Sequence, residues 1–266
     1  NGSVTLGNST VSATAPTGPD GGEGYVGISA SNGNVDTSSS TVRAVGALYA
    51  EGGEGYGGTG VSIYASNNAT LGLVTSSEYV GVNAGGAIID GNTGLNISAL
   101  DVYLVGNNGV GSIANPLETQ VTYLDVYAGN GDIGIINSGD LMLGGGMFGG
   151  QGYGVYAGNG NVAIGSTGTL VVVDGAEGYA GNGNLSFGAN GHLGIYGNVY
   201  ASGDLFLQSG GNMEIGNALA YSGAQAIGEN SVTAVVGGNL SLAPNMYGDA
   251  SYLGSYNGNA TVTTGG

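Results

Sequence analysis

The chain has 266 residues, of which 60 are glycine, and its 18 acids face a single basic residue to give a formal net charge of -17. This charge disfavours nucleic acid and anionic lipid as partners. The absence of cysteine excludes a disulfide scaffold and a cysteine-ligated zinc site. Glycine does not recur at every third position, which excludes collagen. No run of 18 or more apolar residues exists, so we expect no membrane insertion.

The apolar residues indicate a folded all-β chain. They make up 41% of the sequence when tyrosine is included, and Val, Leu, Ile and Ala alternate with polar residues as in half-buried strands. A disordered chain has no reason to keep such alternation in phase. Helix is disfavoured because Gly, Asn, Ser and Thr are frequent while Lys, Arg and Glu are rare.

A repeated doublet of short apolar segments runs along the chain. It is clearest over 132–215, where Ile133-Gly134-Ile135 is followed, eight residues after its start, by Leu141-Met142-Leu143. A polar corner that contains glycine separates the two halves. Copies of the doublet are predicted to start at Val4, Val35, Val61, Ala87, Ile133, Val162, Leu185, Leu205, Val232 and Ala260.

The spacing of these copies predicts a coiled architecture. Most lie 20 to 31 residues apart, which is one turn of a coil with three short faces, and the longer gap after Ala87 predicts a degenerate copy near residue 110. The doublet supplies two faces. The third is predicted from the segments Val26-Gly27-Ile28, Val155-Tyr156-Ala157 and Asn198-Val199-Tyr200.

We therefore expect a right-handed parallel β-helix (β-solenoid) of roughly eleven coils, in which each strand pairs with its equivalent one coil away. Residues 1–266 are expected to form a single shaft. Because the sequence begins and stops inside the repeat, we expect it to be an excerpt or a processed part of a longer chain.

Residues 105–143 resemble a known family. The run Gly111-Ser112-Ile113-Ala114-Asn115-Pro116-Leu117-Glu118-Thr119 leads into Gly129-Asn130-Gly131-Asp132-Ile133. This combination resembles the shaft repeats of filamentous-haemagglutinin-like large bacterial exoproteins. The resemblance implies a right-handed parallel β-helix, a secreted or cell-surface location, and an adhesive or structural role. The family's amino-terminal secretion domain is not recognisable in this chain.

Acidic and amide residues recur at the corners before apolar strands. Asp132, Asp140 and Asp204 share this place with several asparagines, namely Asn161, Asn184, Asn212, Asn239 and Asn259. Calcium could bind there, but calcium-binding solenoids repeat Gly-Gly-x-Gly-x-Asp in tandem, and no tandem occurs. We favour corners whose side chains bond the turning backbone, and we expect no cofactor and no metal.

A triplet of Glu or Gln, Gly and Tyr recurs before the doublets. Tyrosine suits interfaces because it combines a large area with one polar group. The triplets predict a row of aromatic and acidic groups that faces a ligand or a neighbour; the alternative is that tyrosine only covers the coil. The candidate interface residues are Tyr25, Tyr56, Tyr153, Tyr179, Glu23, Glu54 and Glu177.

Catalytic residues are scarce. His192 is the only histidine and lies at a corner, where a solvated turn residue is the simpler interpretation. Arg43 is the only basic residue, which speaks against acidic polysaccharide as a substrate and leaves trypsin one cleavage site, as suits an extracellular protein. We expect no enzyme; a glycan-active β-helix enzyme is the remote alternative.

Two functions remain as expectations. The first is a structural segment of an extracellular fibre that self-associates end to end, since an open coil edge pairs readily with another chain. The second is an adhesin module that binds carbohydrate or a cell surface through its tyrosines.

Overall fold

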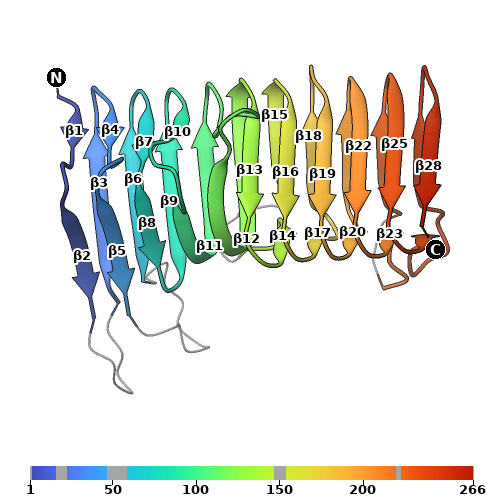
Figure 1. The fold of residues 1–266 in the computed structure, drawn as a ribbon, viewed down its shortest axis with the longest axis horizontal. Coiled ribbons are helices and arrows are strands. Elements are labelled where there is room, and N and C mark those ends of the chain that lie inside the picture. The colour runs from blue at the N-terminus through green and yellow to red at the C-terminus, as the bar shows by residue number, and fades with distance from the viewer. Residues whose placement is uncertain (1, 16–22, 47–58, 147–153, 220–222, 266) are drawn as a thin grey trace.

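The computed structural model describes residues 2–15, 23–46, 59–146, 154–219 and 223–265, and none of these residues forms a helix. Every strand pairing among them is parallel. The predicted all-β, parallel architecture is confirmed. Successive coils follow one another along the long axis, with the two termini at opposite ends (Figure 1). Within the described residues, no helix is long and apolar enough to cross a membrane.

The first strand of each coil forms a row that we call the first row. Its members are β1 (Val4–Thr5), β4 (Val35–Asp36), β7 (Ala69–Leu71), β10 (Ile88–Asp90), β13 (Ile133–Asn137), β16 (Val162–Ser166), β19 (Leu185–Ala189), β22 (Asp204–Ser209), β25 (Ser231–Val236) and β28 (Ala260–Thr264).

The last strand of each coil forms the third row. Its members are β3 (Tyr25–Ala30), β6 (Gly60–Ala65), β9 (Tyr79–Ala84), the ends of β11 (Ile97–Gly106) and β12 (Leu117–Asn130), β15 (Val155–Asn159), β18 (Glu177–Ala180), β21 (Asn198–Ala201), β24 (Gln225–Gly228) and β27 (Tyr252–Ser255). The three segments predicted for the third face lie here, in β3, β15 and β21, which confirms that prediction.

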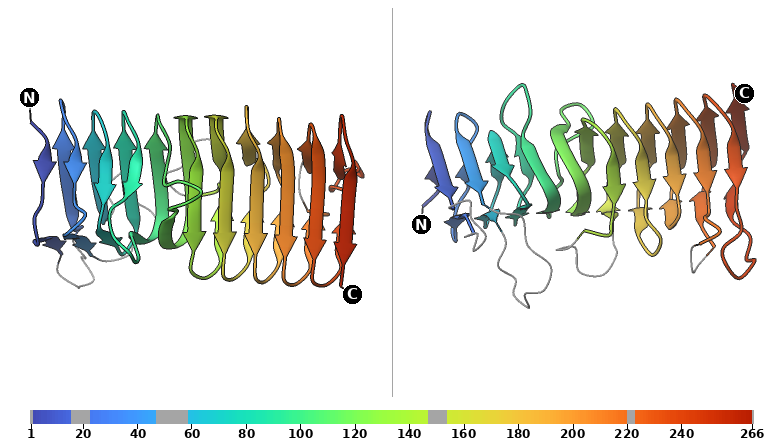
Figure 2. Two further views of the ribbon diagram at one scale, coloured as in Figure 1. Left: turned by 45° about the horizontal axis from the view of Figure 1, so that its top comes forward. Right: turned by 90° about the horizontal axis from the view of Figure 1, so that it is seen from below.

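The strands between these rows fall into two sets. In the first coils they are β2 (Thr10–Thr14), β5 (Thr41–Val45) and β8 (Leu73–Ser76), and in the last coils they are β14 (Leu141–Leu143), β17 (Leu170–Val172), β20 (Leu193–Ile195), β23 (Met213–Ile215) and β26 (Leu240–Leu242). The long strands β11 and β12 join the sets, as two views show (Figure 2). The cross-section therefore changes in the middle of the rod.

One register position runs through all the coils. The equivalent residues, each paired with the next, are Val4, Val35, Ala69, Ile88, Val110, Ile133, Val162, Leu185, Leu205, Val232 and Ala260, eleven in total. Val110 occupies its place through isolated bridges to Ile88 and Ile133, which confirms the degenerate copy predicted near residue 110.

The predicted copy at Val61 is wrong. Val61 lies in β6 of the third row, paired with Val26 and Val80, and the next first-row strand is β7. Both segments alternate apolar and polar residues, so alternation alone could not separate a first-row strand from a third-row strand. The span 47–58, which lies between β5 and β6 in the sequence, has no apolar pattern to set the phase.

Corners between coils need glycine where the backbone turns with positive φ. Gly131, just before β13, has φ of +94°, and a Cβ at this position would overlap the backbone carbonyl of Asn108 in the preceding coil. Both the dihedral angle and the close approach therefore require glycine at this corner.

The interior is filled by stacked apolar side chains whose volumes compensate across a coil. Ile164, Phe187 and Leu207 occupy one position in successive coils, and Val155, Gly178 and Val199 occupy another. A Cβ on Gly178 would lie 2.9 Å from the ring of Phe187, which is fully buried. The large ring thus fills the space that valine fills one coil before and one coil after.

This compensation is testable with a double-mutant cycle. Phe187→Leu alone should cost roughly 1 to 3 kcal/mol of unfolding free energy because it leaves a cavity, and Gly178→Val alone should cost a similar amount through overpacking. The double variant should recover at least about 1 kcal/mol relative to the sum of the two. Urea unfolding measures each value.

Phe206→Leu in the next coil is the matched control. Phe206 points outward and is 37% exposed, so its change should lie within about 0.5 kcal/mol of zero. Additive effects of the Phe187 and Gly178 changes would contradict the compensation.

Candidate functional site

The third row carries a concentration of tyrosines on its outer side. The pattern of β3 alternates exposed and buried residues, so that Tyr25 points outward while Val26 and Ile28 point inward. Outward tyrosines of this row continue along the rod and are Tyr25, Tyr64, Tyr103, Tyr127, Tyr156, Tyr179 and Tyr200. This tyrosine face is the strongest candidate site.

The predicted interface residues are only partly brought together. Tyr25 aligns with Gly60 and Tyr79, whereas Tyr179 aligns with Tyr156 and Tyr200, so the two tyrosines occupy different register positions of the third row. Glu23 and Glu177 are exposed near the starts of their strands. Tyr56, Tyr153 and Glu54 lie outside the described residues. The triplet therefore does not define a single register row.

Four tyrosines that sequence reasoning did not group form a continuous stack. The ring centroids of Tyr127 and Tyr156 lie 5.1 Å apart, those of Tyr156 and Tyr179 lie 5.0 Å apart, and those of Tyr179 and Tyr200 lie 5.4 Å apart. The interplanar angles are 3°, 12° and 18° in the same order. The dipeptide Tyr-Ala recurs in these four strands, at Tyr127-Ala128, Tyr156-Ala157, Tyr179-Ala180 and Tyr200-Ala201. This recurrence is the sequence signal from which the stack could have been predicted.

Several tyrosine rings also cover glycines of their own strands. A Cβ at Gly81 would overlap the hydroxyl of Tyr79, and a Cβ at Gly254 would overlap that of Tyr252. Each glycine follows its tyrosine by two residues, so both lie on the outer side of the strand. The ring shields a backbone segment that has no side chain of its own, which explains why Tyr-x-Gly recurs.

Two tyrosines donate hydrogen bonds to glutamates one coil further on. The Tyr196 hydroxyl lies 3.1 Å from Oε2 of Glu214, and the Tyr200 hydroxyl donates a short bond to Oε1 of Glu229. Burial and then the Glu214 charge raise the pKa of Tyr196 to about 12. The bond to Glu229, followed by burial, raises the pKa of Tyr200 to about 12. Both phenols are therefore protonated donors at neutral pH.

The acidic corners bond the backbone of the next coil. Oδ1 of Asp132 accepts the N–H of Asn161 at 2.8 Å, and Oδ1 of Asn161 in turn accepts the N–H of Asn184 at 3.0 Å. Oδ1 of Asn184 accepts the N–H of Asp204 at 2.8 Å, which continues the series. We call this series the corner ladder. It gives these side chains a structural role.

A second corner holds the other predicted residues. Asp140, His192, Asn212 and Asn239 precede paired strands, so they share a register position that differs from that of Asp132. Oδ1 of Asp140 accepts the N–H of Thr169 at 2.7 Å. The predicted single corner is thus two. Within the described part of the chain, no group of three or more His, Cys, Asp or Glu could hold a metal ion.

Polar side chains also line the inner side of one corner, which sequence reasoning missed. The buried Asn137 accepts the N–H of Val121 at 2.9 Å and donates to the carbonyl of Asp140 at 3.1 Å. Ser166 and Ser209 take its place in later coils and donate to corner carbonyls. These residues satisfy backbone groups that the turn leaves without partners.

Acids are also buried where the cross-section changes. Asp125, which is 3% exposed, accepts the N–H of Gly154 at 3.0 Å through Oδ1, while Oδ2 has no hydrogen-bond partner among the described residues. Burial raises the pKa of the Asp125 carboxyl, the Gly154 bond lowers it, and the charge of Asp101 raises it further. Burial and then Asp90 likewise raise the pKa of Glu118.

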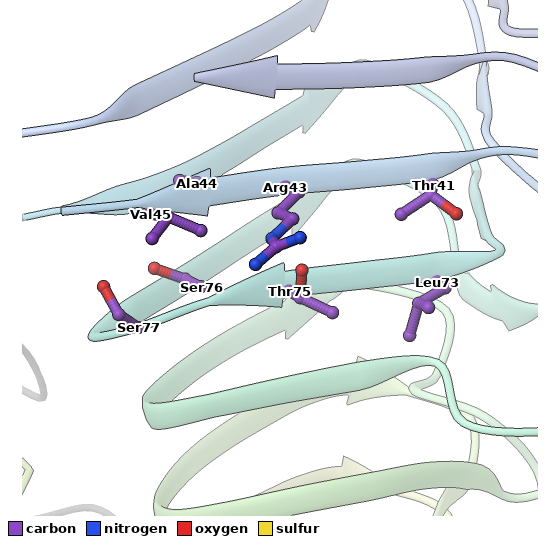
Figure 3. A pocket seen from close by; sticks show the side chains of 8 residues that line it. All are labelled: Thr41, Arg43, Ala44, Val45, Leu73, Thr75, Ser76 and Ser77. Atoms are coloured by element: carbon purple, nitrogen blue, oxygen red, sulfur yellow. The ribbon is translucent and has the colours of Figure 1, made fainter. Parts of the chain in front are cut away.

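The single basic residue lies in an open hollow. Arg43 is on the outer side of β5, beside Thr75 of the paired strand β8, and both line an open hollow of about 430 Å³ (Figure 3). Its walls are Thr41, Arg43, Ala44, Val45, Leu73, Thr75, Ser76 and Ser77. One guanidinium among hydroxyls can hold a single anionic group. A second hollow of about 210 Å³ lies over β13, β16 and β19, where the outward residues are mostly small.

Comparison of the chain with protein-family models, with curated proteins and with solved structures gives no match. The features of the molecule that bear on its role are the continuous strand rows, the corner ladder and the tyrosine face.

The buried Asp125 predicts how stability depends on pH. Because the pKa in the folded chain is raised, its contribution to stability is present below the ordinary value of about 3.9 and is lost as pH rises through the raised pKa. Asp125→Asn should therefore raise the unfolding free energy at pH 7 and reduce its dependence on pH, since Asn keeps an acceptor for the Gly154 N–H.

Urea unfolding at pH 4, 5.5 and 7 measures this dependence. Asp204→Asn is the control, because it removes one negative charge from an exposed corner. If the free energy of unfolding at pH 7 rises equally in both variants, the effect comes from net charge, and the role of burial is contradicted.

Proposed function

We propose that the chain is a right-handed parallel β-helix that serves as a structural shaft segment of an extracellular or cell-surface fibre. The main support is the register position that passes through eleven successive coils. At about 4.8 Å per coil this is a rod on the order of 50 Å long. Right-handedness follows from the twist of parallel strands and their crossover connections.

The distribution of specialised residues supports a structural role. The corner ladder, the inner polar corner and the Phe187–Gly178 pair all serve contact within a coil or between adjacent coils. The corner ladder and the inner polar corner recur in several coils, as expected of a rod that carries load along its length. The resemblance of residues 105–143 to filamentous-haemagglutinin-like exoproteins agrees with this role and with a secreted location.

Self-association is proposed through the open edges of the terminal coils. Among the described residues, β28 pairs only with β25, and β1 pairs only with β4. Edge strands with free N–H and C=O groups accept further parallel strands. Further coils of a longer chain or of a second copy of this chain would complete these edges.

We predict filaments that depend on the last strand. The Val232 N–H donates to Asn259 of the last coil, and the equivalent of Val232 there is Ala260. By the two-residue period of a strand, the N–H groups of Ala260 and Val262 face the open side. Val262→Pro removes one of these donors and should abolish filaments or shorten them severalfold, whereas Val262→Ala should not.

Negative-stain electron microscopy of the purified chain at several salt concentrations and pH values measures filament length. Short rods of uniform length under all these conditions would refute end-to-end assembly. Filaments that persist in Val262→Pro would locate the assembly contact elsewhere.

The second candidate is an adhesin module that binds carbohydrate or a cell surface. It is favoured by the exposure of Tyr25 (60%) and Tyr64 (46%) on the outer side of the third row. Sugars commonly pack on open aromatic faces, and these two rings are not part of the four-tyrosine stack.

A glycan array distinguishes the two candidates. An adhesin should bind a defined glycan, and Tyr25→Ala with Tyr64→Ala should weaken that binding at least about tenfold, equivalent to about 1.4 kcal/mol. Tyr252→Ala, on the same row near the C-terminal end, is the control. If chains that form filaments bind no glycan, the adhesin candidate is refuted and the structural role is the remaining candidate.

A further inference from the structure

The stacked tyrosines Tyr127, Tyr156, Tyr179 and Tyr200 have a geometry that suggests chemistry. Their rings are nearly parallel, with centroids 5.0 to 5.4 Å apart, and they are held by strands β12, β15, β18 and β21 of adjacent coils. Tyr127 is 39% exposed and the other three are half-buried. The stack is therefore both ordered and within reach of solvent.

The stacking also limits what the four rings can bind. Ring faces inside the stack contact neighbouring rings, so a sugar cannot lie on them. One edge of the Tyr156 ring lies near Gly158 and one edge of the Tyr179 ring lies near Gly181, while all four rings remain partly exposed. The groups available to a reagent are thus phenols whose carbons beside the hydroxyl lie near the equivalent carbons of the next ring.

We propose that this stack is a site of oxidative cross-linking, at which a one-electron oxidant such as a haem peroxidase with hydrogen peroxide joins tyrosines of adjacent coils. Each of two phenols loses one electron and one proton, and the resulting radicals form a carbon–carbon bond between positions ortho to the oxygens. The ring hydrogens at those positions move to the oxygens, restoring two phenols. One hydrogen peroxide accepts the two electrons and two protons and becomes two waters.

Proximity makes the coupling within one chain efficient. Two phenoxyl radicals free in solution must meet by diffusion, whereas adjacent rings of the stack are already oriented face to face. The strand pairing fixes which partners meet, because only Tyr127–Tyr156, Tyr156–Tyr179 and Tyr179–Tyr200 are neighbours. The product would tie coils together covalently in a chain that has no cysteine.

One end of the stack has a built-in proton acceptor. The Tyr200 hydroxyl donates to Oε1 of Glu229, so a carboxylate is in place to take the proton when the phenol is oxidised. Loss of the proton together with the electron avoids a charged phenol radical. Tyr200 should therefore be oxidised readily, and its nearest ring partner is Tyr179. Glu229 acts here as a positioning residue and proton acceptor.

The test treats the dilute, purified chain with horseradish-type haem peroxidase and hydrogen peroxide. Dityrosine fluorescence and mass spectrometry after glutamyl-specific proteolysis detect and map the bonds. A Tyr156–Tyr179 bond would join the peptide ending at Glu177 to the peptide beginning at Gly178. We expect these bonds in monomeric chains, and a higher urea midpoint after oxidation.

Conservative variants keep the stack while removing the chemistry. Tyr156→Phe with Tyr179→Phe leaves no two adjacent phenols in the stack and should reduce its mapped cross-links at least tenfold. Tyr64→Phe is the matched control, since Tyr64 occupies the same register position but is flanked by Ser29 and Asn83. Glu229→Gln should lower the share of Tyr179–Tyr200 bonds severalfold and leave Tyr127–Tyr156 bonds unchanged.

The outcomes decide the proposal without reference to filament formation. Absence of dityrosine, mapped bonds only between different chains at high dilution, or unchanged fluorescence in the double phenylalanine variant would each overturn it. An equal loss of all three bonds in Glu229→Gln would overturn the part assigned to Glu229.

Discussion

In-register pairing between successive coils is the constraint on which the rest of the structure depends. A side chain at one position meets the side chain at the same position of the next coil, about 4.8 Å away. Interior positions therefore favour stacked aliphatic groups, corners favour glycine or groups that bond across the gap, and outer positions can align aromatic rings. The apolar series through Val110, the corner ladder and the tyrosine stack are three results of one geometry.

The same constraint explains how irregularity is tolerated. Phe187, in the first strand of its coil, is accommodated because Gly178, in the last strand of the preceding coil, leaves space for its ring. The polar interior near Asn137 and the buried Asp125 lie where β11 and β12 join two arrangements of the middle strands. The change of cross-section itself is confined to the region of β11 and β12.

Much of the fold was predictable from the sequence because the repeat carries its own phase. Alternation identified the third-face segments, and the long gap located the copy at Val110. Val61 was misplaced because first-row and third-row strands look alike in sequence, and the long glycine-rich span 47–58 before β6 interrupts the phase of the repeat. The Glu/Gln-Gly-Tyr triplet does not mark one register position, since Tyr25 is the first residue of β3 whereas Tyr179 is the third residue of β18. Pairs such as Phe187 and Gly178 required knowledge of which strands face each other across the interior.

The corner ladder gives the rod a direction. At the position directly before each strand, the side-chain oxygen belongs to the earlier coil and the N–H to the later one, as for Ser3 and Asn34, Asp132 and Asn161, and Asn212 and Asn239. At this position one end of the rod therefore presents backbone donors, and the other presents side-chain acceptors. Two rods can match these groups only when they point the same way, so a fibre built from them would be polar, with ends that differ in growth and in what they bind.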